Sequence, residues 1–329
     1  MNKIISIIFL FAFTSLIAQE FDNPEDLFYD DATDSYYISN TGTGQIVKID
    51  AEGNKSNLGY KNLGSHGIEM WNGNILACFG NKLNVIDADN GNKIKSIKFQ
   101  QAKFLKDITK IDDGCYLLTD FSEKKIFKLK IGENGNYEIS EWLNVGTIPN
   151  GIYADDSYVY LTIWGAEGAI SRINKKSKTI ENVFVTEYAN LLNITSDGEH
   201  LYISVWKQND VIKFKKDFSA EPIILENNTV LHPGGLHFDD KKNKLIMTDL
   251  GLNRFNPEGK EKEEKISTAN LELNAFPNPV VYNTRISYHL DTSGEVVFQL
   301  FNCKGKLIKT VRRKLNRLET ISSFWRKKI

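Results

Sequence analysis

Acidic, amide and histidine side chains stand beside several short apolar segments of this 329-residue chain. Glu25, Asp107 and Asn150 offer the hard oxygen ligands that Ca²⁺ or Mg²⁺ prefers. His66 and His232 are candidate catalytic bases near neutral pH, and Asp107 is a third catalytic candidate. Two simpler interpretations stay open. Asn150 beside a glycine is also ordinary turn chemistry, and His232 before Pro-Gly-Gly is typical of a loop.

Two tryptophans and several polar residues follow other apolar segments. Trp164 and Trp206 each stand two residues after a hydroxyl residue, at equivalent positions of neighbouring segments. Exposed indoles there would form a stacking platform for a sugar or another flat ligand, whereas buried indoles would simply pack between segments. The candidate ligand-binding residues are Asn40, Asp120, Trp164, Asn190, Trp206 and Asp249.

A repeat along the chain positions these residues. Each copy contains a β-rich run that ends in a small hydroxyl or thiol residue, and successive copies are 39, 41, 43, 42 and 44 residues apart. A second run of apolar-x-basic-apolar order follows in most copies, for example at 46–49 and 126–129. A repeat of roughly 40 residues with several short strands is the signature of a propeller blade. The copies end at Ser39, Cys78, Thr119, Thr162, Ser204 and Thr248.

We therefore predict an all-β fold with a six-bladed propeller over residues 20–256. Six copies in phase disfavour the alternative, a β-sandwich or several small β domains. Neighbouring strands of a blade run in opposite directions, so the loop before the first strand and the loop after the second open on one face. All the candidate residues should then surround one mouth of a central channel. We also expect residues 20–22 to supply an outer strand that closes the ring against the last blade.

Composition excludes some classes of function. The formal net charge is −1, so the chain lacks the basic stripe of a nucleic-acid-binding protein. Three cysteines without close spacing indicate neither a disulfide framework nor a zinc site.

The two ends of the chain differ from its middle. Residues 1–18 are typical of a cleaved signal peptide, because Lys3 precedes an apolar run that ends at Ala18. That run is shorter than the roughly 20 residues of a membrane span, so we expect no stable span, and an uncleaved anchor is the alternative. Residues 257–270 are highly charged and predict a linker or a solvated edge strand. Residues 271–329 alternate apolar and polar types and predict a separate small β domain.

This last segment resembles a known sorting domain. Phe-Pro-Asn-Pro at 276–279, an alternating run at 286–290, and a run at 297–301 followed by Gly-Lys are similar to the type A C-terminal sorting domain of type IX secretion. The resemblance implies a small Ig-like β-sandwich that the type IX secretion machinery recognises, carries across the outer membrane and normally removes. The Gly-Xaa-Tyr strand that closes the family pattern is missing, so we expect 271–329 to be a truncated copy.

The propeller segment resembles further families. The copy at 116–129 is similar to NHL repeats, and 149–162 is similar to the senescence-marker-protein and gluconolactonase propellers. The latter resemblance implies a divalent metal at the channel mouth, held by a Glu of blade one, the Asn of a Pro-Asn-Gly turn and the Asp of a later Pro-Asp-Gly turn. Glu25 and Asn150 match the first two ligands, and blades five and six contain no Pro-Asp-Gly turn.

Together these features predict an exported propeller, secreted or held at the cell surface, that binds a small-molecule or carbohydrate ligand or a protein partner. If the shortened sorting domain fails, the protein would stay in the periplasm. The alternative is a metal-dependent lactonase or esterase. It would use Glu25 and Asn150 with an unidentified third ligand, and Ca²⁺ or a similar divalent metal as cofactor.

Overall fold

The computed structural model describes residues 21–59, 61–62, 64, 66–219, 222–225 and 230–261, and further strands between 274 and 326. The chain divides into two compact units, Met1–Lys260 and Glu261–Ile329. The described residues form strands, turns and loops, which confirms the predicted all-β class. Within them there is no helix with the length and apolarity to cross a membrane.

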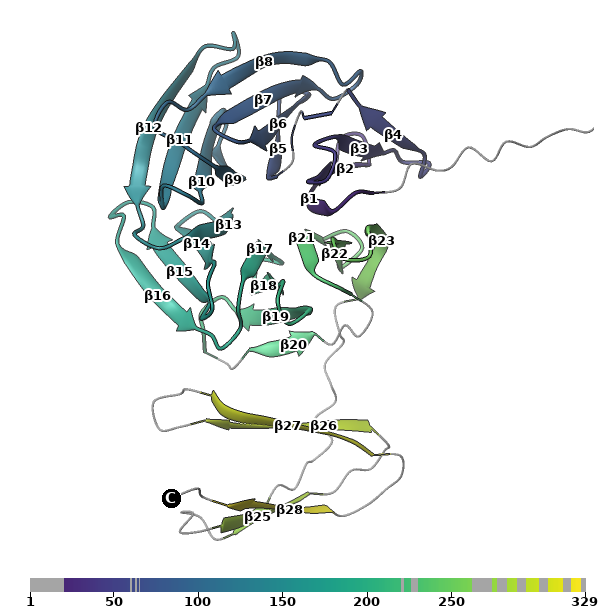
Figure 1. The fold of residues 1–329 in the computed structure, drawn as a ribbon, viewed down its shortest axis with the longest axis vertical. Helices are drawn as coiled ribbons and strands as arrows, with labels where there is room; N and C mark the ends of the chain where they lie inside the picture. Colours follow the sequence, from purple (N-terminus) through teal and green to yellow (C-terminus); the bar gives the residue numbers. More distant parts are fainter. Residues whose placement is uncertain are drawn as a thin grey trace, which may run out of the picture. The chain divides into compact units, whose positions relative to one another are not determined.

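Six antiparallel sheets surround a common centre, which confirms the predicted six-bladed propeller (Figure 1). In each sheet the strands follow chain order, and the first strand lies innermost (Figure 1). Blade 1 holds β1 (Pro24–Asp30), β2 (Ser35–Asn40), β3 (Ile46–Ile49) and β4 (Lys55–Leu58); blade 2 holds β5 (Ile68–Trp71), β6 (Asn74–Phe79), β7 (Lys82–Asp87) and β8 (Lys93–Lys98); blade 3 holds β9 (Leu105–Asp112), β10 (Cys115–Asp120), β11 (Lys125–Ile131) and β12 (Tyr137–Asn144). Blade 4 holds β13 (Pro149–Ala154), β14 (Tyr158–Ile163), β15 (Ala169–Asn174) and β16 (Ile180–Val185); blade 5 holds β17 (Leu191–Ser196), β18 (His200–Val205), β19 (Asp210–Lys215) and β20 (Ile223–Leu225); blade 6 holds β21 (Pro233–Asp239), β22 (Lys244–Asp249) and β23 (Arg254–Glu261).

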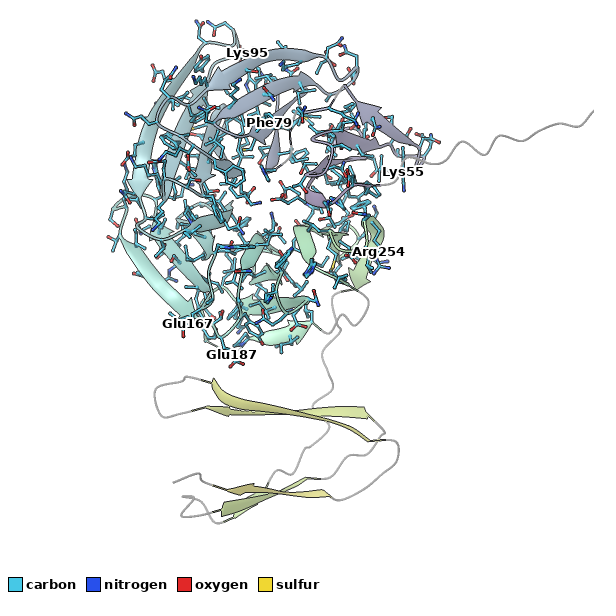
Figure 2. All side chains as sticks on the ribbon, viewed as in Figure 1. Lys55, Phe79, Lys95, Glu167, Glu187 and Arg254 are labelled. Carbon is cyan, nitrogen blue, oxygen red and sulfur yellow. The ribbon has the colours of Figure 1, made fainter. Side chains whose placement is uncertain are left out.

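The hydrophobic core lies between neighbouring blades. Leu76 and Leu83 of blade 2, for example, share one buried cluster with Tyr116 and Leu118 of blade 3. Because each sheet packs against a neighbour on both faces, second strands such as β2 and β10 are buried along their whole length, with apolar residues in the middle and polar residues at the end. The outer strand β8 instead alternates charged and apolar residues and is mostly exposed. Figure 2 shows the side chains that fill the spaces between the sheets and project toward the centre of the ring.

The hydroxyl that recurs in the sequence fastens one blade to the next. Thr162 Oγ1 accepts a hydrogen bond from Gly151 N within its own blade (2.7 Å) and donates one to the carbonyl of Leu192 in the following blade (2.8 Å). Thr119 makes the equivalent pair of bonds in blade 3. In blade 2 the residue is Cys78, and its backbone N–H donates to Gly67 O instead. Each threonine therefore satisfies two buried backbone groups that would otherwise lack partners.

Contacts between blades 6 and 1 close the ring. Phe21 is buried against Phe255, with ring centroids 6.3 Å apart, and Asn253 Oδ1 accepts a hydrogen bond from Asn23 N. Residues 21 and 22 lie beside blade 1, where Asp22 O accepts a bond from Gly42 N. They form no strand, so the predicted outer strand is wrong for the described part of 20–22, and the sixth sheet has three strands.

The second unit contains two further sheets. One has the order β24 (Asn274–Phe276), β25 (Asn283–Tyr288), β28 (Ile321–Arg326), and the other pairs β26 (Gly294–Phe301) with β27 (Leu307–Leu315). The start of the predicted charged segment, 257–261, belongs to β23, and 262–270 lies outside the described residues. The predicted signal peptide, 1–18, also lies outside them.

Candidate functional site

Two rings of residues surround the centre of the propeller at one end. The register pairs the start of each innermost strand with the end of the second strand, as in Leu105↔Asp120 and Pro233↔Asp249. The loops next to those residues therefore open on one face, which we call the mouth. The upper ring, nearer the mouth, is Glu25, His66, Lys106, Asn150, Leu192 and Gly234; the lower ring, one residue further along each blade, is Asp26, Gly67, Asp107, Gly151, Asn193 and Gly235.

The lower ring alternates hydrogen-bonding side chains with glycines. Asp26, Asp107 and Asn193 come from blades 1, 3 and 5, and the glycines come from blades 2, 4 and 6. Each of the three side chains accepts a hydrogen bond from a backbone N–H of the following blade. These bonds are Asp26 from Ile68 (2.9 Å), Asp107 from Ile152 (2.9 Å) and Asn193 from Leu236 (3.1 Å).

The glycines allow close approach at the other three junctions. A Cβ atom on Gly67 would lie 2.5 Å from the Cα of Asp107, and one on Gly235 would lie 2.7 Å from the Cα of Asp26. Non-bonded carbon atoms prefer a separation of about 3.5–4.0 Å, so a side chain at either position would push the blades apart. Asp107, a predicted catalytic residue, is thus an inter-blade link whose two carboxylate oxygens each accept a backbone hydrogen bond.

Glu25, His66 and Lys106 form an ion cluster in the upper ring, across blades 1 to 3. Glu25 Oε2 lies 2.9 Å from Nδ1 of His66, and Lys106 Nζ pairs with Glu25 Oε1. Their side chains are 8%, 14% and 12% exposed, respectively. Burial opposes ionisation of Glu25, but the nearby Lys106 ammonium and the His66 imidazole lower its pKa to about 2. Glu25 is therefore ionised, and its charge is neutralised within the cluster.

His66 has the geometry of an oriented base. The Glu25 carboxylate holds Nδ1, and the ring packs edge-on against Phe104 with centroids 4.7 Å apart. Nε2 makes no hydrogen bond to any other described residue. An imidazole that a carboxylate orients in this way can take a proton from a bound molecule.

A small cavity lies beside the two rings. Its volume is about 10 Å³, room for about one water molecule, and it is lined by Glu25, Asp26, Gly67, Lys106, Asp107, Asn150, Leu192 and Asn193. Asn150 is 1% exposed; its Nδ2 donates to Leu191 O (2.9 Å), and its Oδ1 has no hydrogen bond. Burial raises the pKa of Asp107 to about 7. Burial, with the nearby charge of Asp107, raises the pKa of Asp26 well above its ordinary value.

The predicted metal ligands Glu25 and Asn150 both line this cavity. The Glu25 carboxylate is already engaged by Lys106 and His66. In the part of the chain that the structure describes, no three His, Cys, Asp or Glu residues are grouped to hold a metal ion. Because Ca²⁺ takes about six to eight oxygen ligands, this donor set does not fit a divalent cation as it is arranged.

Three of the predicted ligand-binding residues brace the loops of the mouth. The buried Asp120 carboxylate accepts hydrogen bonds from Lys103 N and Ser122 N, and thereby joins the loops on either side of β9 and β10. Asp249 does the same in blade 6, and Asn40 in blade 1. Their polar atoms are occupied by the protein itself, and a direct ligand role for them stays a prediction.

Aromatic rings form a continuous crescent on the mouth. Neighbouring members have ring centroids 4.1 to 6.1 Å apart, and every member is partly exposed. We call this set the aromatic crescent; it consists of His66, Phe104, Phe121, Trp164, Trp206 and His232, from blades 2 to 6. The two predicted tryptophans therefore contact each other and remain accessible. In blade 6 the exposed Leu231 and Leu252 stand next to the crescent.

His232 and Asn190 hold the crescent in place. The His232 ring stacks on Trp206 at 4.1 Å and 14°, and its Nδ1 lies 2.9 Å from Trp206 O. Asn190 has φ 60°, and its backbone bonds to Gly165 and to Trp206, which ties the two tryptophan loops together. For His232 this is the structural loop role that its Pro-Gly-Gly context indicated, and its catalytic role stays a prediction.

The sequence analysis missed Lys106, Phe104 and Phe121. Lys106 stands one residue before Asp107, at the repeat position of Glu25 and Asn150. Aligning the blades at that position would have placed an ammonium beside the predicted metal ligand. Phe104 stands three residues before Asp107 and Phe121 directly follows Asp120, and the sequence alone does not distinguish either from a core phenylalanine.

No family model matches the sequence, and no curated protein matches it either. Solved structures share the fold. A gluconolactonase from Xanthomonas campestris aligns with a TM-score of 0.59 at 14% identity, over 70% of this chain and 84% of that one. An auxiliary nutrient binding protein from Bacteroides thetaiotaomicron aligns with a TM-score of 0.55 at 10% identity, over 72% and 68%.

An inactive virginiamycin B lyase from Staphylococcus aureus, solved with quinupristin, aligns with a TM-score of 0.52 at 18% identity, over 68% of this chain and 76% of that one. Identities this low show likeness of fold alone. The chain is thus a six-bladed β-propeller similar to gluconolactonase and streptogramin B lyase structures.

Proposed function

We propose that this protein is an exported β-propeller that binds a small molecule or a carbohydrate at its mouth. The observation that carries the proposal is the aromatic crescent. Six rings from five blades lie in contact and stay partly exposed. Aromatic faces that remain accessible provide large contact area for a flat ligand.

The upper ring adds hydrogen-bonding groups beside the aromatic crescent. The Glu25 charge is neutralised by Lys106, so the upper ring presents hydrogen-bonding groups without a large excess of charge. Blade 1 interrupts the crescent with the polar residues Asn23 and Thr41. A ligand with one flat apolar face and a polar edge would match this arrangement.

Trp206 provides the direct test. Purified full-length protein would be titrated with a panel of soluble saccharides and small aromatic compounds, with tryptophan fluorescence as the signal. Trp206→Ala should weaken binding by about 30-fold, because truncating a central aromatic anchor costs about 2 kcal/mol. Trp142→Phe in the outer strand β12 is the matched control and should leave the affinity unchanged. Equal affinities for wild type and Trp206→Ala would contradict the proposal.

A metal-dependent lactonase or esterase is the second candidate, because Glu25 and Asn150 line one cavity. Metal analysis and lactone hydrolysis would be measured on wild type and Glu25→Ala. Metal-dependent turnover that the substitution abolishes would favour the hydrolase. A third candidate, docking of a protein partner on the exposed Leu231 and Leu252, predicts capture of a specific protein that is indifferent to metal and is lost in Leu252→Asp.

Export is part of the same proposal. Residues 1–18 act as a cleaved signal peptide, and 271–329 act as a type IX sorting domain with a small Ig-like sandwich, supported by the sequence resemblance and by strands β24 to β28. Mass spectrometry of the mature protein should find a new N-terminus near residue 19. Fractionation would distinguish delivery to the surface from retention in the periplasm, and retention would show that the sorting domain is inactive.

A further inference from the structure

The cavity beside the two rings is short of positive charge. Among the described residues that line it, Glu25, Asp26 and Asp107 carry carboxyl groups and Lys106 carries the ammonium. Lys106 pairs with Glu25. Asp26 and Asp107 form no ion pair among the described residues, although the Lys106 ammonium acts electrostatically on Asp107, and both stand at 7% exposure. A cation that entered the cavity would therefore meet two buried carboxyl groups that are not ion-paired.

The same cavity presents a hydrogen-bond acceptor that nothing satisfies. Asn150 Oδ1 is buried without a partner, and the bond from Nδ2 to Leu191 O fixes which way the amide faces. The two oxygens of Asp26 accept hydrogen bonds from Ile68 N and Asn193 Nδ2. Those of Asp107 accept hydrogen bonds from Ile108 N and Ile152 N. Each of these four oxygens can accept one more hydrogen bond. Unsatisfied buried acceptors are costly, so this arrangement favours a guest that brings several donors.

We propose that the ligand of the mouth carries a primary ammonium group, which enters the cavity while an apolar or aromatic body lies on the crescent. This inference rests on the proposed binding function and names its ligand class. An ammonium has three donors, carries the missing positive charge and is close in size to the single water that the cavity can hold. A hydroxyl group would bring one donor and no charge.

Other occupants fit the cavity less well. Ca²⁺ takes about six to eight oxygen ligands, and among the described residues no three His, Cys, Asp or Glu side chains are grouped to hold a metal ion. A water molecule would satisfy Asn150 but would bring no positive charge to stabilise the ionised form of either aspartate. Burial raises the pKa values of Asp26 and Asp107, and a cation in the cavity would favour the ionised carboxylates over the protonated ones.

A matched pair of ligands tests the inference. Calorimetric titration of the full chain at pH 7 would compare tryptamine with tryptophol, which has a hydroxyl in place of the ammonium. Tryptamine should bind about tenfold tighter or more, as charge-assisted hydrogen bonds are about twice as strong as neutral ones. Asn150→Leu removes one of the acceptors and should reduce that preference, and Asn150→Asp adds a carboxylate and should strengthen it. Asn54→Leu, in an exposed turn of blade 1, is the control and should change neither affinity.

The outcomes separate this inference from the binding function. Equal affinity for the two compounds would overturn the ammonium assignment and leave the crescent as a binding surface. The ammonium assignment would also be overturned if saccharides bind in a way that depends on Trp206 while neither tryptamine nor tryptophol binds. Binding of Ca²⁺ or K⁺ that Asn150→Leu abolishes, without any preference for tryptamine, would replace the ammonium by an inorganic cation. If nothing in either panel binds, both proposals fail. Thermal unfolding of each variant ensures that lost binding reflects the site and not lost folding.

Discussion

Glu25 is ionised in a buried position because two neighbouring blades supply its partners. Its carboxylate would lose hydration on burial without compensation, and Lys106 and His66 replace that hydration with direct hydrogen bonds. The cluster joins blades 1, 2 and 3 at the mouth, so it supports the position of the crescent as well as its own charges.

Lys106→Met should destabilise the protein more than its loss of packing suggests. It leaves the buried Glu25 carboxylate without its ammonium partner, and breaking a buried ion pair on one side costs about 3–5 kcal/mol. The measurement is urea denaturation at pH 7. The double variant Glu25→Gln, Lys106→Met removes both charges and should recover much of the loss. If the double variant is no more stable than Lys106→Met, the pair is not the cause.

Asp107 predicts how stability depends on pH. Its pKa is about 7 in the folded protein against an ordinary value of 3.8, so between these values the folded state holds a proton that the unfolded state has released. Stability must therefore fall as the pH rises from about 4 to about 7. Glu69, whose pKa burial raises to about 7, acts in the same direction. Glu25, with its lowered pKa, acts oppositely, and its contribution is lost only as the pH falls below about 4.5.

Asp107→Asn should flatten this profile. Removing one such group lowers the slope of unfolding free energy by up to about 1.4 kcal/mol per pH unit between pH 4 and 7. Denaturation curves at several pH values give the slope, and Asp113→Asn at an exposed turn serves as the control. An unchanged slope in Asp107→Asn would show that this carboxyl titrates normally.

The second strand of each blade does more than add a hydrophobic layer. Its terminal hydroxyl, as in Thr119 and Thr162, bonds the innermost strand of its own blade and the backbone of the next blade. The hydroxyl residue that recurs in the sequence is thus the residue that connects neighbouring blades. In blade 2 this position is Cys78, which has no hydroxyl to make these bonds.

Thr162→Val should cost about 2–6 kcal/mol. The isosteric change leaves Gly151 N and Leu192 O buried without their partner, and each unsatisfied group costs about 1–3 kcal/mol. Thr179→Val, in the exposed hairpin of the same blade, is the matched control and should change stability by no more than about 0.5 kcal/mol. Chemical denaturation compares the two. Equal small effects would mean that water replaces the hydroxyl.

The whole ring closes through side-chain contacts. Blade 1 consists of β1 to β4 and blade 6 of β21 to β23, so among the described residues no single sheet combines both ends of the propeller. The junction depends on a shared cluster that includes Phe21, Ile246 and Phe255, together with the bond from Asn23 to Asn253.

Phe21→Ala should loosen this junction first. Truncating a buried phenylalanine costs about 3–5 kcal/mol, and here the loss falls on the contact between blades 6 and 1. Hydrogen exchange should rise in β21 to β23 before it rises in β9 to β12. Ile94→Ala, at an exposed position, is the control. Uniform acceleration in all six blades would indicate that the ring opens only as a whole.

Local sequence features were sufficient for the architecture and insufficient for the site. The hydroxyl spacing predicts six blades because each blade repeats one local pattern, and strand order then places Glu25 and Asn150 at one end. The partner of Glu25 could not be predicted from local pattern, since Lys106 is 81 residues away and meets it only when the ring curves. The use of Asp120 as a loop brace was hidden for a similar reason, because a carboxylate that caps backbone N–H groups looks like a ligand in the sequence.

The alternation around the lower ring also limits how a wheel of this kind can grow or shrink. Removing one blade would set either two hydrogen-bonding side chains or two glycines next to each other, so the new junction would be crowded in the first case and would lack a bridging hydrogen bond in the second. Adding or deleting blades in twos keeps the order intact. This geometry therefore permits blades to be duplicated or lost only in pairs, and related propellers that keep the alternating ring should have an even number of blades.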